Sequence, residues 1–291
     1  MRFVYNIYHQ LNNDPVICLR RVKPLLSYYD YPRENFIMEN HAYIIVGDQP
    51  ILITKIFNFD DYNELSWLHK EEIRILSALS LCAPNIGWYS FYVHEATYVS
   101  DSNAHSFDLR DNNIVNELLS FASKKLGIDL CLNIEKKAKV ENEEYLCPPE
   151  VLFNAIDITN DTLIKALNYW VKACMLLQHR QFNEEATALL FFSMEGILKL
   201  FHKELQSEYS DVRVTDVIDY LIQTFDVPEG YKDYTVMCYE LRNNYVHPFE
   251  SGWNGNFVAD DMLETFNVLK DIIYIYLTRN PSIESSRIQT L

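Results

Sequence analysis

Glycine is scarce in this sequence, with seven glycines among 291 residues. This is about a third of ordinary usage, and it disfavours folds built on glycine-rich loops or many tight hairpins. The sequence has no GxxxxGK phosphate loop and no GxGxxG turn, which argues against the nucleotide-binding folds that depend on them. It also has no run of about 18 uninterrupted apolar residues, so we expect no membrane span.

The cysteines show neither CxxC pairs nor the spacing of a disulfide framework. Because a chain of this length can stand without disulfides, we expect buried thiols in a reducing compartment. The first residues also lack the apolar segment of a secretory signal, so we expect a cytoplasmic location. No metal-ligand motif is present, and we expect neither a metal nor a cofactor. The six cysteines are Cys18, Cys82, Cys131, Cys147, Cys174 and Cys238.

Positive charge is also in short supply. The net charge is −16, and both halves of the chain share it. Residues 1–150 carry 14 basic and 21 acidic side chains, and residues 151–291 carry 11 and 20. General electrostatic binding of nucleic acid needs a positively charged surface. Any contact with RNA therefore has to come from a small basic site in a negative surround, such as one assembled between subunits.

What the chain does contain is apolar residues, at 48%, together with 20 tyrosines and 16 phenylalanines. This is enough to bury a core, and the length suits two domains. The pattern changes around Cys147-Pro148-Pro149-Glu150, where the double proline interrupts helix and sheet. We therefore predict an α+β domain over residues 1–150, followed by an all-α helical bundle over residues 158–280 and a flexible tail over residues 281–291.

The first domain mixes short strands with helices. Residues 41–46 and 51–59 flank Gly47-Asp48-Gln49-Pro50, which predicts a hairpin with a four-residue loop. Helical periodicity is found at residues 64–81 and 114–126. Further strands are expected at residues 3–8, 16–22, 88–99 and 129–134.

The second domain is almost purely helical in period. Apolar residues recur at steps of three and four, which is typical of amphipathic helices that pack into a bundle. Asn183 has the residue type of an N-cap. The expected helices are residues 161–179, 183–205, 212–225, 231–245 and 260–278.

A polar segment stands at the end of the fourth expected helix. It reads Arg242-Asn243-Asn244-Tyr245-Val246-His247-Pro248. Pro248 disfavours helical geometry at the preceding histidine, so the helix should end at or before Val246. A chain that leaves the helix near Asn244 can turn the imidazole back toward the guanidinium. The sequence therefore indicates a cluster of Arg242, Asn243 and His247, although Arg and His near a helix end also suit the negative end of the helix dipole.

This segment and its helical context resemble the HEPN superfamily (higher eukaryotes and prokaryotes nucleotide-binding domains). The signature of that family is an arginine, then a polar residue, and a histidine four to six residues after the arginine. Arg242, Asn243 and His247 match it. Residues 188–199 also resemble the long second helix of such domains, which often carries an inward acidic residue. The resemblance covers roughly residues 158–280, and residues 1–150 resemble no family.

The resemblance implies a homodimer that brings two Arg/His sets into one cleft, and many members are metal-independent endoribonucleases. In such a reaction the 2′-OH of RNA attacks the adjacent phosphate. Histidine titrates near neutrality and can move the proton, while arginine can stabilise the added negative charge. Asn243 would orient His247 or a phosphate oxygen. Glu195 could pair with Arg242, or it could be an ordinary solvated glutamate.

Three functions stay open at this point. The first is an endoribonuclease that acts as a toxin or antiviral-defence effector, with residues 1–150 as a sensor and an inhibitory or antitoxin partner; this role rests on family analogy. The second is a non-catalytic HEPN module that binds a nucleotide or serves dimerisation, which the acidic surface favours. The third is a protein-interaction scaffold.

Overall fold

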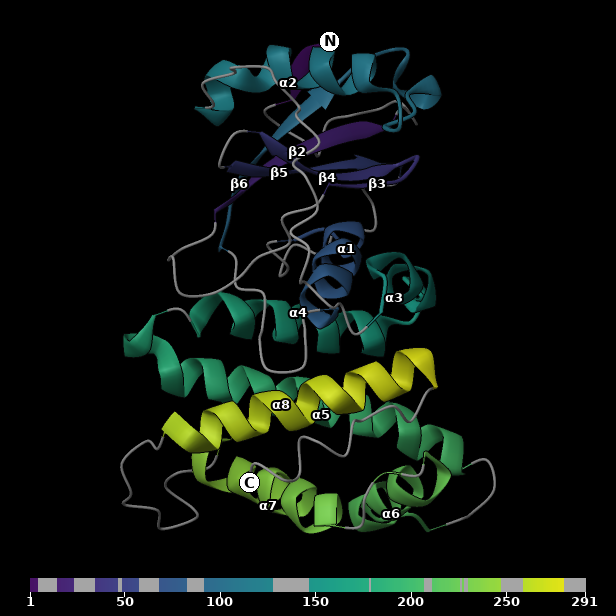
Figure 1. Cartoon of the computed structure of the whole chain (residues 1–291), viewed down its shortest axis with the longest axis vertical. Coiled ribbons are helices and arrows are strands. Elements are labelled where there is room, and N and C mark those ends of the chain that lie inside the picture. The colour runs from purple at the N-terminus through teal and green to yellow at the C-terminus, as the bar shows by residue number, and fades with distance from the viewer. Residues whose placement is uncertain are drawn as a thin grey trace. The chain divides into compact units, whose positions relative to one another are not determined.

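The chain folds into two units, Met1–Tyr145 and Leu146–Leu291, in the computed structural model. The first unit combines a sheet with helices and the second is all-helical, so the predicted order of an α+β region and an all-α region is confirmed (Figure 1). The division falls between Tyr145 and Leu146, one residue before the Cys147-Pro148-Pro149-Glu150 segment. The expected tail at 281–291 lies outside the described residues. The structure describes residues 1–4, 15–23, 35–46, 49–57, 68–82, 92–127, 147–177, 179–206, 211–225, 227, 230–246 and 259–279.

A six-stranded sheet forms the framework of the first unit. Its order is β1-β6-β2-β5-β4-β3, and all its pairings are antiparallel. The last strand in sequence therefore lies between the first two. The strands are β1 (Arg2–Val4), β2 (Val16–Lys23), β3 (Phe36–Ile37), β4 (His41–Val46), β5 (Gln49–Ile56) and β6 (Tyr92–Ser100).

Most of the expected strands are present, with shifted ends. The expectations at 16–22 and 41–46 are confirmed. Strand β6 overlaps the expected 88–99 and ends one residue later. The short edge strand β3 was not predicted. Residues 5–8, 58–59, 88–91 and 129–134, where further strand was expected, lie outside the described residues.

The predicted hairpin is confirmed, but its predicted four-residue loop is wrong. Val46 pairs with Gln49, and Ile45 pairs with Pro50. Only two residues separate the paired ends of β4 and β5. Proline is tolerated near the start of β5 because the ladder to β2 begins one residue later, at Ile51.

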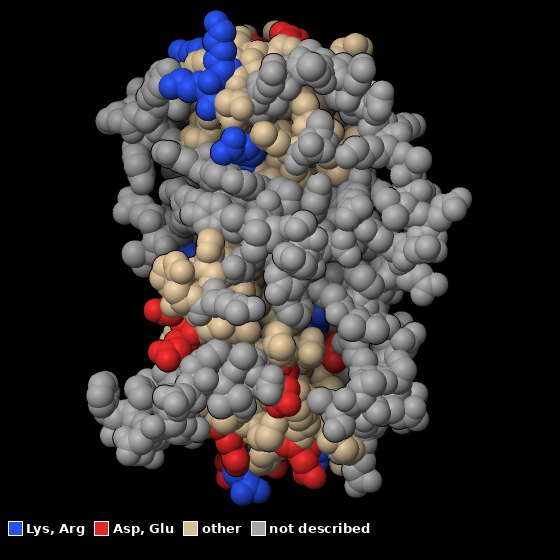
Figure 2. All heavy atoms as spheres, turned by 60° about the vertical axis from the view of Figure 1, so that its left-hand side comes forward, with Lys and Arg blue, Asp and Glu red and all other residues tan. Residues whose placement is uncertain are grey.

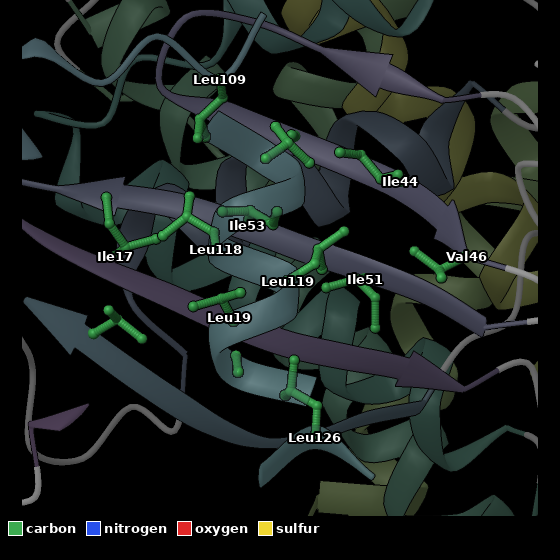
Figure 3. Close-up of a cluster of buried hydrophobic side chains, with 14 of the residues drawn as sticks. Ile17, Leu19, Ile44, Val46, Ile51, Ile53, Leu109, Leu118, Leu119 and Leu126 are labelled. Carbon is green, nitrogen blue, oxygen red and sulfur yellow. The ribbon is translucent and has the colours of Figure 1, made fainter. Parts of the chain in front are cut away.

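The two faces of the sheet carry different helices (Figure 1). Helix α2 (Asn112–Leu126) covers one face, and its N-cap is Asp111, whose side chain accepts from the backbone N–H of Asn113. A cluster of buried aliphatic side chains lies between this helix and strands β2, β4 and β5, and Figure 3 shows it. The alternation of each strand sends every second side chain into this core. Among its members are Ile17, Leu19, Ile44, Ile51, Ile53, Leu118 and Leu119.

Helix α1 (Lys70–Leu81) lies on the opposite face and begins later than predicted. The predicted start at residue 64 is wrong, because His69 is its N-cap and Leu68 is not helical. The imidazole Nδ1 of His69 accepts from the backbone N–H of Glu71, and Glu72 accepts from the backbone N–H of His69 at 3.0 Å. These reciprocal bonds set the start of the helix in place of the apolar period.

A buried ion pair joins α1 to β2. The Arg20 guanidinium donates to both carboxylate oxygens of Glu72, at 2.6 and 3.0 Å, and the Cys18 thiol donates to the same carboxylate at 3.2 Å. Arg20 is 1% exposed and Glu72 is fully buried. Burial raises the pKa of Glu72, but the charge and hydrogen bonds of Arg20 lower it more, so that its pKa lies below the usual range. The carboxylate therefore stays ionised inside the unit.

The second unit contains the five helices that were predicted and one more, together with the short 3-10 turn η4 (Arg180–Phe182). No helix among the described residues is both long and apolar enough to cross a bilayer. The helices are α3 (Pro149–Ala155), α4 (Asp161–Leu176), α5 (Asn183–Gln206), α6 (Val214–Thr224), α7 (Gly230–Val246) and α8 (Ala259–Thr278).

The unpredicted helix α3 begins inside the double proline. Pro148 is its N-cap and Pro149 its first residue. Proline suits that position because the first N–H groups of a helix have no partner within the helix. The prolines therefore start a helix where the sequence pattern indicated only an interruption. Asn183 also differs from its predicted N-cap role, since it is the first helical residue of α5 after η4.

Helix α5 is central to this unit, because it contacts α4, α6, α7 and α8. It lies close to α4 at Gly196, where an added Cβ would approach the Cβ of Ala166 to 2.8 Å. Trp170 on α4 stacks on Phe266 of α8 with ring centroids 4.5 Å apart. This contact joins α4 to α8 within the core. The close approach of α4 and α5 thus depends on the missing side chain at position 196.

We predict that Arg20→Met lowers the stability of the first unit by about 3–5 kcal/mol, because it leaves a buried carboxylate without its partner. Hydrogen exchange of the α1 and β2 amides in the full chain measures this. The double variant Arg20→Met/Glu72→Leu should recover most of the loss. Arg110→Met, which breaks the exposed pair with Asp108, is the control and should leave exchange unchanged.

The contribution of the ionised Glu72 carboxylate to stability depends on pH. The pKa of Glu72 is lower in the folded than in the unfolded chain, so its contribution is complete above its ordinary value of 4.5. It is lost as the pH falls through the lower folded value. The difference in stability between the wild type and Glu72→Gln should therefore shrink below pH 4.5. A difference that stays constant down to acid unfolding would contradict this.

We predict that Gly196→Ala destabilises the second unit by about 1–2 kcal/mol, although alanine is the better helix former, because the added methyl group overlaps Ala166. Urea unfolding measures the change. Gly230→Ala is the matched control, since a Cβ there meets nothing within 4 Å. The double variant Ala166→Gly/Gly196→Ala should lose less unfolding free energy than the two single variants lose in sum, because removal of the Ala166 methyl group makes room for the new one. If the two losses simply add, the close-approach explanation is wrong.

Candidate functional site

The candidate site lies on helix α7, which positions Arg242. This helix continues through Asn243 and Asn244 and reaches Val246. The predicted end at or before Val246 is therefore confirmed, whereas the earlier exit near Asn244 is wrong. Arg242 lies four residues before the end, outside the last turn, where the favourable field of the helix C-terminus has weakened. The helix dipole is thus a poor explanation for this arginine.

The Arg242 guanidinium stacks on an aromatic ring of its own helix. Its Cζ lies 4.5 Å from the centroid of the Tyr239 ring. Residues three apart on a helix are neighbours, so this contact follows from the spacing alone. A cation over an aromatic face is attracted by the ring quadrupole. The Arg242 side chain is 22% exposed, so part of it remains open to solvent.

Glu195 on the neighbouring helix α5 is the acidic partner of this arginine. Its Oε2 lies 3.5 Å from Nη1 of Arg242. Its side chain is 57% exposed, so the pair lies at the surface where α5 and α7 meet. The sequence left two roles open for Glu195, and the structure places it within ion-pair distance of Arg242. Gly196, the next residue, packs on α4 and leaves Glu195 on a different side of α5.

The structure does not bring the whole predicted cluster into view. The backbone of Asn243 is helical, and its side chain is not among those described. His247 lies outside the described residues. Convergence of Arg242, Asn243 and His247 therefore stays a prediction.

Tyr239 and a buried polar cluster between α7 and α8 were not predicted from the sequence. The hydroxyl of Tyr231 donates to Oδ2 of Asp271 at 2.9 Å, and both side chains are buried. Burial raises the pKa of Tyr234, and the nearby Cys238, Glu264 and Asp271 raise it further. The sequence feature that could have indicated this buried polar cluster is Lys270-Asp271, two charged residues inside the apolar run of α8.

Three of the described cysteines, Cys18, Cys147 and Cys174, are not activated nucleophiles. Burial raises the pKa of the Cys18, Cys147 and Cys174 thiols, and a thiol needs a lowered pKa to be reactive at neutrality. Cys18, Cys82, Cys174 and Cys238 are buried, as expected, whereas Cys147 is only partly buried. Cys131 lies outside the described residues. Within the described ranges, no three His, Cys, Asp or Glu side chains gather as a possible metal-ligand set.

Acidic side chains predominate among the charged groups described on the helical unit, on the face that Figure 2 shows. Several of its described basic side chains are in ion pairs: Lys232 with Asp219, Arg213 with Asp216 and Arg279 with Glu204. A nucleic acid would therefore meet a mostly negative surface, and a phosphate-binding role would rest on few residues.

No protein-family model, curated protein or solved structure matches this chain.

We predict a weak coupling between Glu195 and Arg242. A double-mutant cycle with Glu195→Gln and Arg242→Gln should give about 0.2–1 kcal/mol in unfolding free energy, falling as salt is added, because the pair is exposed. The cycle of Glu204 and Arg279, whose guanidinium donates at 2.6 and 3.0 Å, serves as comparison and should give more. A coupling above about 2 kcal/mol for the first pair would mark it as structural.

Proposed function

We propose that the helical unit is a metal-independent endoribonuclease of HEPN type, acting in the cytoplasm as a homodimer. The observation that carries the proposal is the Arg242-Asn243-His247 spacing at the end of a bundle helix. The Arg242 guanidinium supports it, because this cation lies over the Tyr239 ring and its side chain is partly exposed.

The proposed reaction cleaves RNA by its own 2′-OH. One His247 imidazole accepts the proton of the 2′-OH as its oxygen attacks the adjacent phosphorus. The bond from phosphorus to the 5′-oxygen breaks, and a protonated His247 of the second subunit donates a proton to that oxygen. The products are a 2′,3′-cyclic phosphate and a 5′-OH end. Arg242 stabilises the extra negative charge of the pentacoordinate state through paired N–H donors, and Asn243 orients His247 or a phosphate oxygen.

The connectivity of the chain allows Arg242 and His247 to act on the same phosphate. Arg242 and Val246 are one helical turn apart, so their Cα atoms are separated by about 6 Å. His247 follows Val246 directly, and consecutive Cα atoms are about 3.8 Å apart. The Cα atoms of Arg242 and His247 therefore lie within about 10 Å of each other, whatever the conformation of the chain after Val246. Side chains of these lengths can meet on one phosphate across such a separation.

The second candidate is a non-catalytic module that binds a nucleotide or serves dimerisation. The surplus of acidic residues in 151–291 and the ion pair of Arg242 with Glu195 favour it, because both oppose the approach of a polyanion. A protein-interaction scaffold is the third. Two further features of the first candidate rest on the family resemblance. They are a toxin or defence role with an antitoxin partner, and a sensor role for the first unit.

We predict that the purified protein cleaves labelled RNA in EDTA and leaves 5′-OH ends, which accept a new phosphate from a polynucleotide kinase. Arg242→Ala and His247→Ala should each reduce the rate about 100-fold or more, because each removes one catalytic contribution.

The matched controls are Arg213→Ala and His105→Ala, which remove an exposed arginine and an exposed histidine elsewhere. They should cleave at the wild-type rate. Nucleotide binding that depends on Arg242, without cleavage, would favour the non-catalytic module. If Arg242→Ala and His247→Ala change neither cleavage, binding nor oligomeric state, only the scaffold remains.

A further inference from the structure

We propose that the outer face of α4 and α5 binds single-stranded RNA, with lysines that hold phosphate groups and an aromatic pair on which a base stacks. The inference deepens the proposed ribonuclease and rests on it for the choice of RNA, but it does not use Arg242. We call this surface the lysine face. It consists of Lys165, Tyr169 and Lys172 on α4, and of Phe192, Lys199 and Lys203 on α5.

The α4 part of the lysine face is one stripe along the helix. Steps of four and three residues lead from Lys165 to Tyr169 and on to Lys172, and such steps keep side chains on one side of a helix. Lys165 is exposed, and the other two side chains are partly exposed, whereas Trp170 is buried in the core. At 1.5 Å per residue the two lysines are about 10.5 Å apart along the helix axis, with the tyrosine ring between them.

Phe192 joins a second stripe, on α5, to the first. Its ring centroid lies 5.5 Å from that of Tyr169. Phe192 is 39% exposed, so part of its ring is open to a ligand. Lys199 follows it by seven residues and Lys203 by eleven, which places both on the same side of α5, and both are exposed.

The two stripes place lysines on both sides of the aromatic pair. Ala166 approaches Gly196, and Tyr169, further along α4, contacts Phe192, which comes earlier on α5. The two helices are therefore antiparallel, and Lys199 lies toward the beginning of α4. The aromatic pair thus lies within a row of cations contributed by two helices.

The charge of these lysines is not cancelled at contact distance. None of the four forms an ion pair with a described residue. Glu195 and Glu204 on α5 are each within ion-pair distance of an arginine from another helix. The other carboxylates of the two helices lie in first turns, where the helix dipole favours an anion. These are Asp161, Glu184 and Glu185.

Single-stranded RNA is the ligand that matches both features of the lysine face. Proteins bind single strands by combining cations along the backbone with aromatic side chains on which bases stack. A double helix keeps its bases paired and stacked, so that an open ring has nothing to bind. An acidic protein segment would match the lysines alone and leave the exposed ring of Phe192 unused.

The test is the anisotropy of a labelled 2′-O-methyl RNA of about 12 nucleotides, titrated with the full-length protein at several salt concentrations. The methyl group removes the attacking 2′-OH, so the probe binds without being cut. Lys165→Gln/Lys172→Gln should lower the slope of log Kd against log salt by about 1.4, since each phosphate contact on a single strand contributes about 0.7. Phe192→Leu keeps an apolar side chain without a ring and should raise the Kd about fivefold or more.

Matched controls make the same changes in the first unit. Lys124→Gln/Lys125→Gln removes two exposed lysines of α2, and Phe57→Leu removes a ring that is 45% exposed. Both should keep the wild-type Kd and salt slope. Lys199→Gln/Lys203→Gln removes the lysines of the second stripe and should lower the slope as the α4 pair does, while thermal melting checks that every variant is folded.

The outcomes distinguish the lysine face from the proposed ribonuclease. Wild-type binding in the lysine variants and in Phe192→Leu, or equal losses in the controls, would overturn it. Displacement of the probe by polyglutamate, with no effect of Phe192→Leu, would also overturn it, in favour of an acidic protein partner. The expected losses support it even if ordinary RNA is never cleaved, in which case the ribonuclease fails and an RNA-binding module stands. If RNA is cleaved while the variants bind and cleave as the wild type does, the ribonuclease stands and the lysine face fails.

Discussion

The close approach of α4 and α5 is the constraint on which the helical unit depends. Gly196 allows the two backbones to meet where any side chain would overlap Ala166. Because α5 also contacts α6, α7 and α8, the position that this approach gives to α5 is passed on to the rest of the unit. Glu195 and Arg242 come within ion-pair distance only because α5 and α7 are held in this packing. The candidate site thus rests on a contact made by a residue without a side chain.

The elements that could be predicted from the sequence are those with a long, regular apolar period. Helices α4 to α8 belong to this group, because periodic burial determines both their type and their approximate ends. Strands β2 and β4 are buried along almost their whole length, and they could be predicted from short runs rich in apolar residues. Their exact boundaries depend on polar capping, as at His69, where a hydrogen-bonded cap rather than apolar period starts α1. Pro149 was misjudged for a related reason, since proline breaks the interior of a helix and favours its first turn.

The candidate site could be predicted only in part. Arg242 was identified from the spacing of a motif. For Glu195 the sequence left two alternatives, a pair with Arg242 or an ordinary solvated glutamate, because the contact depends on the packing of two helices. Tyr239 stood in the sequence at the right distance from Arg242 and could have been named from helix geometry. The buried bond between Tyr231 and Asp271 joins residues 40 positions apart, and no local pattern predicts such a pairing.

The strand order of the first unit has a consequence for how that unit forms. Strand β1 pairs with β6, and β6 lies between β1 and β2, although β1 and β2 are the first two strands in sequence. The hairpin of β4 and β5 joins residues that are close in the chain and can form early, whereas Arg2 must wait for Ser100 before it has a strand to pair with. Of the strands in this sheet, the one that a ribosome synthesises first is therefore among the last to be incorporated.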